Sequence, residues 1–218
     1  MRKLMWLLGI VLLAVAGPGG AAEIKEGKHY TVLNPQRPVD AKDKIEVTEF
    51  FWYACGHCYN LEPVLQKWLK KQPADVTFRR IPAVFPGRDG RPGNWAPLAQ
   101  VYYTLEALGQ LDKLHGSVFD AIHIDRVNLG DPKVLGDWMA TKGIDRQKLT
   151  ETMNSFAVQS KVMRSMQLST QYGFGGVPAL FVNGRYAVQL GEAGSLEEVT
   201  VILDQLIDKA RKERSAKP

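Results

Sequence analysis

The sequence predicts an α/β fold in which a block of helices interrupts a layered domain of sheet and helix. Three observations predict it. A β-branched and aromatic run at residues 44–53 leads directly into a helical pattern. Residues 94–172 then show helical patterns and no strand pattern. Strand patterns return at 178–190, before one last helix.

The 218-residue chain begins with the pattern of a secretory signal peptide. Arg2 and Lys3 precede an apolar run at residues 4–16, and small residues follow as far as Ala22. The apolar run is shorter than the ~20 residues that a membrane-spanning helix needs, which disfavours an anchor. We expect residues 1–22 to be removed and the mature chain to be soluble, since no later stretch is as apolar.

The charge of the chain does not indicate a nucleic-acid partner. The formal net charge is +5, and it falls to +3 without the leader, which contains two basic and no acidic residues. Apolar residues make up 45% of the sequence, enough for one well-filled core.

The elements before the helical block begin with an extended lead-in segment at residues 23–42. The run 44–53 is a buried-strand pattern, and a helix with regularly spaced apolar residues follows from Cys55. A second strand is predicted at 76–85, where Pro82 limits its length.

Five helical patterns make up the block: 94–108, 111–123, 131–143, 145–154 and 156–173. Asp131 and Asp145 are predicted N-caps, and Gly143 and Gly173 are predicted stops. After the block, Asn183 and Gly184 predict a tight turn that divides 178–190 into two strands. Ser195 and Glu198 have the spacing of a capping box that opens the last helix.

Cys55 and Cys58 are the only cysteines, and their spacing fits several kinds of site. A zinc site needs four ligands, and no second pair is present. The histidines outside the motif are scattered: His29, His115 and His123. Covalent haem attachment needs a histidine directly after the second cysteine, where this chain has Tyr59. A structural disulfide across two residues would close a small loop and stabilise little.

A redox pair fits the local geometry best. A sulfur at the start of a helix faces unpaired N–H groups and the positive end of the helix dipole, and both stabilise a thiolate. Cys55 is therefore the expected nucleophile, and Cys58, one turn later, the resolving thiol. His57 lies where its imidazole can interact with the Cys55 sulfur. Export would place the pair in a compartment that permits a disulfide.

Three further features accompany the motif: Pro63 inside the predicted helix, Val177-Pro178 before the returning strand, and Glu49 in an otherwise apolar strand. With these features the chain resembles the thioredoxin superfamily, and its helical block makes it similar to the DsbA family of exported oxidants. The resemblance implies a thioredoxin fold interrupted by an inserted all-helical domain. We therefore expect a thioredoxin-like domain at 23–88 and 173–218, with the helical insertion at 89–172.

The resemblance also implies roles for site residues. Val177-Pro178 is expected to be a cis peptide that faces the cysteines and offers the backbone of Val177 to an extended substrate. Glu49 is expected beneath the site, where burial raises its pKa and where it exchanges a proton with the buried thiol. An edge glutamate that reaches solvent is the alternative. Either Arg79 or Arg80 is expected beside Glu49.

The aromatic residues Trp52 and Tyr53 precede the motif and belong either to the core or to an apolar rim that holds substrate. The motif itself departs from the best-known pattern of the family in one place. Gly56 stands where the best-known member has Pro, which makes the exact redox poise less certain, whereas His57 is kept and preserves the expected oxidising character.

The function implied is the transfer of the Cys55–Cys58 disulfide to reduced, unfolded exported proteins in the periplasm. Reoxidation is expected to come from a membrane quinone-linked partner similar to DsbB, with no bound cofactor. Two alternatives stay open: an isomerase or reductase of the same superfamily, and a peptide-binding chaperone that does not need the cysteines. Because few residues separate the leader from the first strand, no dimerisation domain fits there and a monomer is expected.

Overall fold

Strand β2 (Ile45–Phe51) lies inside the sheet and is buried at every position. In the computed structural model, which describes residues 23–216, β2 pairs in parallel with β3 (Val76–Pro82). On its other side it pairs antiparallel with β4 (Ala179–Val182). Two neighbours and complete burial explain why the whole run is apolar apart from Thr48 and the two glutamates.

The sheet of the described region has the order β1-β5-β4-β2-β3. Strand β1 (Tyr30–Val32) pairs antiparallel with β5 (Tyr186–Val188) at the edge. The sequence predicted only an extended lead-in segment here, so this strand was missed. It is three residues long and lies among polar residues, and its one buried aromatic, Tyr30, packs edge-to-face on Tyr186 at 5.6 Å between ring centroids.

The hairpin between β4 and β5 confirms the turn that Asn183 and Gly184 predicted. Both residues have positive φ, 53° and 60°. At Gly184 an added Cβ would lie 2.2 Å from the carbonyl oxygen of Arg37, so the turn needs glycine for space as well as for conformation.

One face of the sheet is covered by α1 (Gly56–Leu69) and α7 (Leu196–Ser215). Pro63 lies inside α1, as predicted. The residues that form this part of the core include Val47, Leu61, Leu65, Val182, Leu203 and Leu206. The indole N–H of Trp68 on α1 also donates to Asp204 on α7 at 2.7 Å, which fixes one helix against the other.

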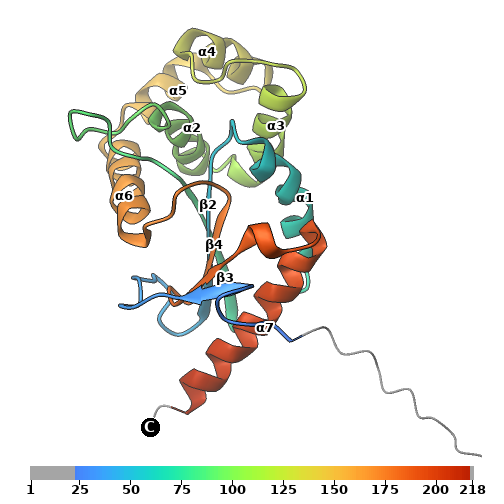
Figure 1. Cartoon of the computed structure of the whole chain (residues 1–218). Coiled ribbons are helices and arrows are strands. Elements are labelled where there is room, and N and C mark those ends of the chain that lie inside the picture. The colour runs from blue at the N-terminus through green and yellow to red at the C-terminus, as the bar shows by residue number, and fades with distance from the viewer. Residues whose placement is uncertain (1–22, 217–218) are drawn as a thin grey trace, which may run out of the picture.

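Five helices stand between β3 and β4 in the sequence: α2 (Ala96–Ala107), α3 (Leu111–His123), α4 (Pro132–Thr141), α5 (Arg146–Met153) and α6 (Phe156–Tyr172). Figure 1 shows α2 to α5 gathered at one end of the sheet, with α6 running down beside it. Helix α6 packs on α2 near its start, and near its end Leu168 and Tyr172 pack against Phe50 of β2. Helix α6 therefore packs both in the core of the helical block and against the sheet. The domain boundary at 172/173 stays a prediction.

The predicted helix ends are largely confirmed. Asp131 and Asp145 accept hydrogen bonds from N–H groups in the first turns of α4 and α5, and Gly173 ends α6 in the left-handed conformation at φ 70°. The capping box before α7 is only half formed. Ser195 accepts from the N–H of Glu198, but the Glu198 carboxylate accepts from the N–H of Gly194 instead of Ser195.

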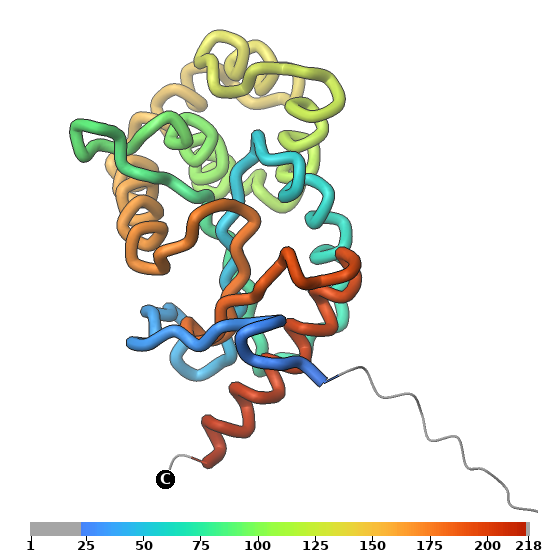
Figure 2. The backbone as a smooth tube through the Cα atoms, viewed as in Figure 1, coloured from blue at the N-terminus to red at the C-terminus, as the bar shows by residue number. Residues whose placement is uncertain are grey.

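The turn between β2 and α1 reaches into the core of the helical block. Phe51, Tyr53 and Cys58 pack in one cluster with residues of α2 and α3. The trace in Figure 2 shows the segment that joins α6 to β4 passing close to this turn. The predicted leader, residues 1–22, lies outside the described residues. None of the helices within 23–216 combines the length and the apolar character that crossing a membrane requires.

Candidate functional site

The two cysteines lie where strand β2 turns into helix α1. Cys55 is the N-cap residue, and its Sγ accepts a hydrogen bond from the backbone N–H of Cys58 at 3.2 Å. Its thiol also donates to the carbonyl oxygen of Val177 at 3.3 Å. Cys55 is partly exposed, whereas Cys58 is 1% exposed and packs in the core of the helical block.

These surroundings move the two pKa values in opposite directions. The pKa of Cys55 is lowered to about 6, first by the hydrogen bond from the Cys58 thiol and then by the backbone N–H groups of Cys58 and His57. The His57 imidazole adds a smaller electrostatic effect, and partial burial opposes all of these. The pKa of Cys58 is raised far above its ordinary value, chiefly by burial. Cys55 is therefore the sulfur equipped to attack or to leave as a thiolate.

We expect the thiolate absorbance of the reduced protein to appear as the pH rises through about 6, instead of the ordinary 9. An ultraviolet pH titration measures this midpoint. Cys58→Ala should move the midpoint upward, because the hydrogen bond from Cys58 is the largest cause of the low pKa. Cys55→Ala should remove the transition. A wild-type midpoint near 9 would contradict the assignment of Cys55 as the reactive thiolate.

The dipeptide between the cysteines is Gly56-His57, and both residues are exposed. An added Cβ at Gly56 would meet no atom within 4 Å. The turn therefore has space for a larger residue, and glycine is not required there to avoid a clash.

The Val177-Pro178 peptide bond is cis, in keeping with the resemblance. It lies in the segment between α6 and β4 and carries the carbonyl that meets Cys55. Beside it is a cavity of about 460 Å³ with a largely apolar lining. The residues that line it include His57, Leu61, Pro178, Leu190, Leu196 and Val199. The cavity is wide enough for an apolar side chain of a polypeptide whose backbone passes Val177.

Glu49 lies on β2, buried beneath the cysteines, with its side chain 2% exposed. Burial raises its pKa to about 8; Arg80 opposes the shift, and the charges of Glu62 and Cys55 add to it. The structure resolves the choice between the two arginines. Arg80 Nε lies 3.4 Å from Glu49 Oε2, whereas Arg79 pairs with Asp40 and Glu46.

Sequence reasoning missed Glu62, which lies one turn after Cys58 on the buried face of α1. Arg80 Nη2 donates to both of its carboxylate oxygens, at 3.0 and 3.1 Å. Burial raises the pKa of Glu62, but His115 and Arg80 outweigh it and the net shift is downward. In the sequence, Glu62 shares one helix face with Cys58, Leu61 and Leu65. This spacing could have indicated that its carboxylate is buried.

The two aromatic residues before the motif divide between the roles that the sequence left open. Tyr53 belongs to the core at 1% exposed. Trp52 is half-buried, and its ring stacks on that of Trp95 with 4.5 Å between centroids. Only Trp52 therefore remains available as a rim residue.

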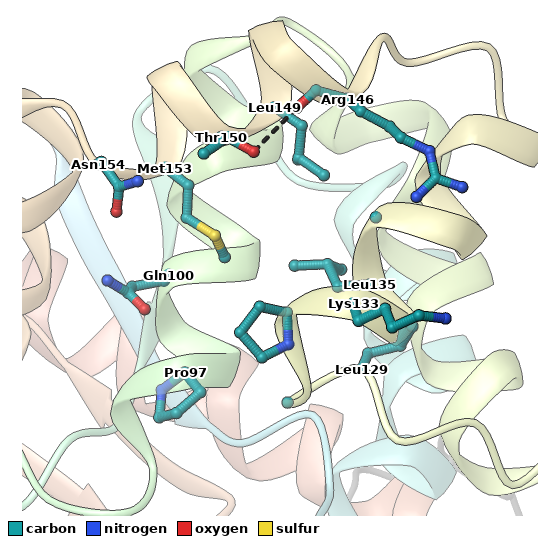
Figure 3. Close-up of a pocket in the computed structure, with 13 residues that line it drawn as sticks. Pro97, Gln100, Leu129, Lys133, Leu135, Arg146, Leu149, Thr150, Met153 and Asn154 are labelled. Atoms are coloured by element: carbon teal, nitrogen blue, oxygen red, sulfur yellow. Dashed lines mark hydrogen bonds between the residues drawn. The ribbon is translucent and has the colours of Figure 1, made fainter.

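A separate cavity of about 450 Å³ lies among α2, α4 and α5 (Figure 3). Leu135, Leu149 and Met153 point into it from α4 and α5. The charged residues at its edge, Lys133 and Arg146, both pair with Asp137. Neither the cysteines nor the residues described around them line this cavity, so it is no part of the cysteine site.

Comparison with known proteins identifies the family to which this fold and this site belong. A family model described as DSBA-like thioredoxin domain matches residues 46–200. The thiol:disulfide interchange protein DsbA of Pseudomonas aeruginosa is 38% identical over 212 residues, which cover 97% of this chain and 98% of that protein. The protein of the same name from Azotobacter vinelandii is 40% identical over 217 residues, covering 97% and 99%.

Solved structures agree. The crystal structure of Pseudomonas aeruginosa DsbA superposes with a TM-score of 0.79 at 40% identity, covering 87% of this chain and 95% of that one. The oxidoreductase DsbA from Xylella fastidiosa gives 0.77 at 30% identity, covering 87% and 98%. The likeness runs from β2 to α7 and includes the helices between them, so it extends far beyond the short cysteine motif. The chain belongs to the family of DsbA-like thioredoxin-domain proteins.

Proposed function

We propose that this protein oxidises reduced, unfolded exported proteins by giving them its Cys55–Cys58 disulfide. One observation carries the proposal: Cys55 caps a helix, has a pKa of about 6 and contacts a deeply buried partner thiol. Selective stabilisation of the Cys55 thiolate favours the reduced form of the pair, and this makes its disulfide a stronger oxidant.

The reaction is two thiol–disulfide exchanges. A substrate thiolate attacks Cys55 Sγ, the Cys55–Cys58 bond breaks, and Cys58 leaves with the electron pair. A second substrate thiolate then attacks the substrate sulfur of the mixed disulfide and expels Cys55 as a thiolate. The substrate loses two electrons and two protons, and the enzyme gains the electrons as a dithiol.

Glu49 serves the buried half of this exchange. Cys58 is 1% exposed, so the thiolate that it forms on leaving lies in a medium that disfavours charge. The protonated Glu49 supplies a proton to it, and the Glu49 carboxylate accepts that proton again when Cys58 must attack during reoxidation. The His57 side chain stays at the surface, where it favours the Cys55 thiolate.

The substrate is held as an extended polypeptide along Val177-Pro178. The Val177 carbonyl that accepts the Cys55 thiol is also available to a substrate backbone N–H, and the adjoining apolar cavity takes a side chain. An unfolded chain offers both groups, whereas a folded protein has its backbone already paired.

The remaining proposals concern the cellular setting. We infer that the protein works as a monomer in the periplasm after removal of its leader. Reoxidation requires an electron acceptor, and a membrane quinone-linked partner similar to DsbB fits that need. Electrons pass through the cysteine pair alone, without a bound cofactor.

The test is to mix the oxidised protein with an equimolar amount of a reduced, unfolded protein that has two cysteines. We expect one disulfide to be transferred per molecule, with the enzyme recovered as the dithiol, as thiol labelling and mass spectrometry would report. A redox titration distinguishes the alternatives, because a strongly reducing potential would favour a reductase. Substrate holding that survives loss of both cysteines would instead support a chaperone.

A further inference from the structure

A chain of buried polar side chains continues from Glu49 to the surface, beyond the groups that the proposed function uses. Arg80 contacts Glu49 and Glu62, and His115 on α3 follows, with its Nε2 3.5 Å from Glu62 Oε1. The other ring nitrogen of His115, Nδ1, lies 2.8 Å from the Tyr53 hydroxyl. His115 is 5% exposed, and the reaction as described above gives it no role.

The outer end of this chain meets solvent where Glu49 does not. A recess of about 570 Å³ opens on the surface between α1, β3 and α3, and Glu62, Arg80 and His115 line it. Glu49 and Cys58 do not line it, and both are almost fully buried. A proton that moves between Glu49 and water therefore has a route past Glu62 and His115.

The surroundings of His115 suit both of its protonation states. Burial is the main cause that raises the pKa of Tyr53 well above its ordinary value, so its hydroxyl keeps its proton. That hydroxyl donates to Nδ1 of the neutral imidazole, which leaves N–H at Nε2, facing Glu62. When the ring is protonated, Nδ1–H donates to the Tyr53 oxygen instead. The hydrogen bond is kept in either state.

Within the described residues, three titratable groups contact the imidazole: Glu62 on α1, Tyr53 after β2 and Tyr102 on α2. The recess that His115 lines is also lined by Arg80 on β3 and by Asp112, Lys113 and Asp120 on its own helix. Glu62 Oε1 lies 3.5 Å from His115 Nε2, and the lowered pKa of Glu62 makes it an anion that attracts the imidazolium. Apolar rings, Phe51 and Phe119, fill the rest of the contact shell.

We propose that His115 carries protons between the surface recess and the buried Glu62–Arg80–Glu49 group, and so limits how fast Cys58 can be deprotonated during reoxidation. The inference rests on the proposed function. In the reduced protein, burial keeps Glu49 protonated at neutral pH, since its pKa is about 8. It must lose this proton before it can accept another from Cys58. The proton leaves past the Glu62 carboxylate, which shares Arg80 with Glu49, to His115 and the recess.

The role of His115 can be measured in one step, the attack of Cys58 on a mixed disulfide between Cys55 and glutathione. Glutathione disulfide reacts with the Cys55 thiolate to give a Cys55–glutathione disulfide and one glutathione. Cys58 then transfers its proton to the Glu49 carboxylate and attacks Cys55 Sγ, and the second glutathione leaves as a thiolate. The first reaction needs only Cys55, whereas the second needs the proton route.

The experiment uses the reduced full-length mature protein, excess glutathione disulfide, acid quenching and mass spectrometry. In His115→Ala we expect the mixed disulfide to form at the wild-type rate and to persist about a hundredfold longer or more at neutral pH, the range expected for loss of a positioned proton carrier. Imidazole in the buffer should shorten its lifetime in this variant and leave the wild type unchanged. His115→Gln, which retains a hydrogen bond to Tyr53 without carrying a proton, should be as slow as alanine.

His123→Gln is the matched control. His123 lies on the same helix and also contacts residue 53, but it does so through the backbone carbonyl, at 2.8 Å, and it does not meet Glu62. Its mixed disulfide should close at the wild-type rate. A wild-type lifetime of the mixed disulfide in His115→Gln would show that His115 only packs and carries no proton. The absence of any response of His115→Ala to imidazole would show the same. Failure of the mixed disulfide to form at all in the wild type would instead contradict the proposed function.

Discussion

Cys55→Ser is expected to abolish disulfide transfer, with a loss of at least about a thousandfold in the rate of oxidation of a reduced two-cysteine protein. A hydroxyl cannot form the disulfide that is donated, and nothing else in the described site presents a sulfur to the substrate. The measurement is the rate of substrate thiol loss under an excess of the variant, compared with the same excess of the oxidised wild-type protein.

Cys58→Ser is the matched variant for this experiment. It keeps Cys55 at the helix N-cap but removes the resolving thiol, so it should capture a substrate as a stable mixed disulfide once Cys55 is activated by a disulfide reagent. The captured species should carry the substrate on residue 55 alone. Retained turnover in Cys55→Ser would remove the basis of the assignment.

Glu49→Gln is expected to change how stability depends on pH. The pKa of Glu49 is about 8 in the folded protein and near its ordinary value of 4.5 in the unfolded chain. A raised folded pKa means that the folded state holds a proton which the unfolded state has lost. The contribution is fully present below pH 4.5 and is lost as the pH rises to about 8. This amounts to about 1.4 kcal/mol per pH unit, roughly 5 kcal/mol over the whole interval.

Glutamine stays uncharged, so this loss should be absent from the variant. Urea unfolding of the reduced protein between pH 4.5 and 8 would show the stability of Glu49→Gln relative to the wild type increasing with pH. Glu197→Gln, an exposed change on α7, provides the control and should follow the wild type throughout. A constant difference between Glu49→Gln and the wild type would show that Glu49 is already ionised in the fold.

The sequence was informative wherever local chemistry decides the structure. Helix caps, the Asn183-Gly184 turn and the apolar run of β2 depend on residues close in sequence, and each was predicted. The cysteine spacing and Val177-Pro178 were enough to indicate the family. Strand β1 was missed because its pairing with β5 depends on a partner more than 150 residues away in the chain, not on a strong pattern of its own.

The contacts among the buried polar side chains beneath the cysteines could not be predicted from the sequence for the same reason. Glu49 was noticeable because it interrupts an apolar run, but nothing local distinguishes Arg79 from Arg80 on a short strand whose two arginines point to opposite faces. His115 seemed to be one of several scattered histidines. Only the packing of α3 against α1 brings it to Glu62, and no spacing in the sequence encodes that contact.

The contact between Cys55 and Val177 joins residues 122 positions apart, with the whole helical block between them. While the chain is being synthesised, Cys55 emerges long before the Val177 carbonyl that faces it. The place where a substrate backbone is held is therefore assembled only after Val177-Pro178 and the residues that line the adjoining cavity have been made. Until then an emerging molecule is a reduced, unfolded chain with two cysteines, of the kind that we propose its mature copies oxidise.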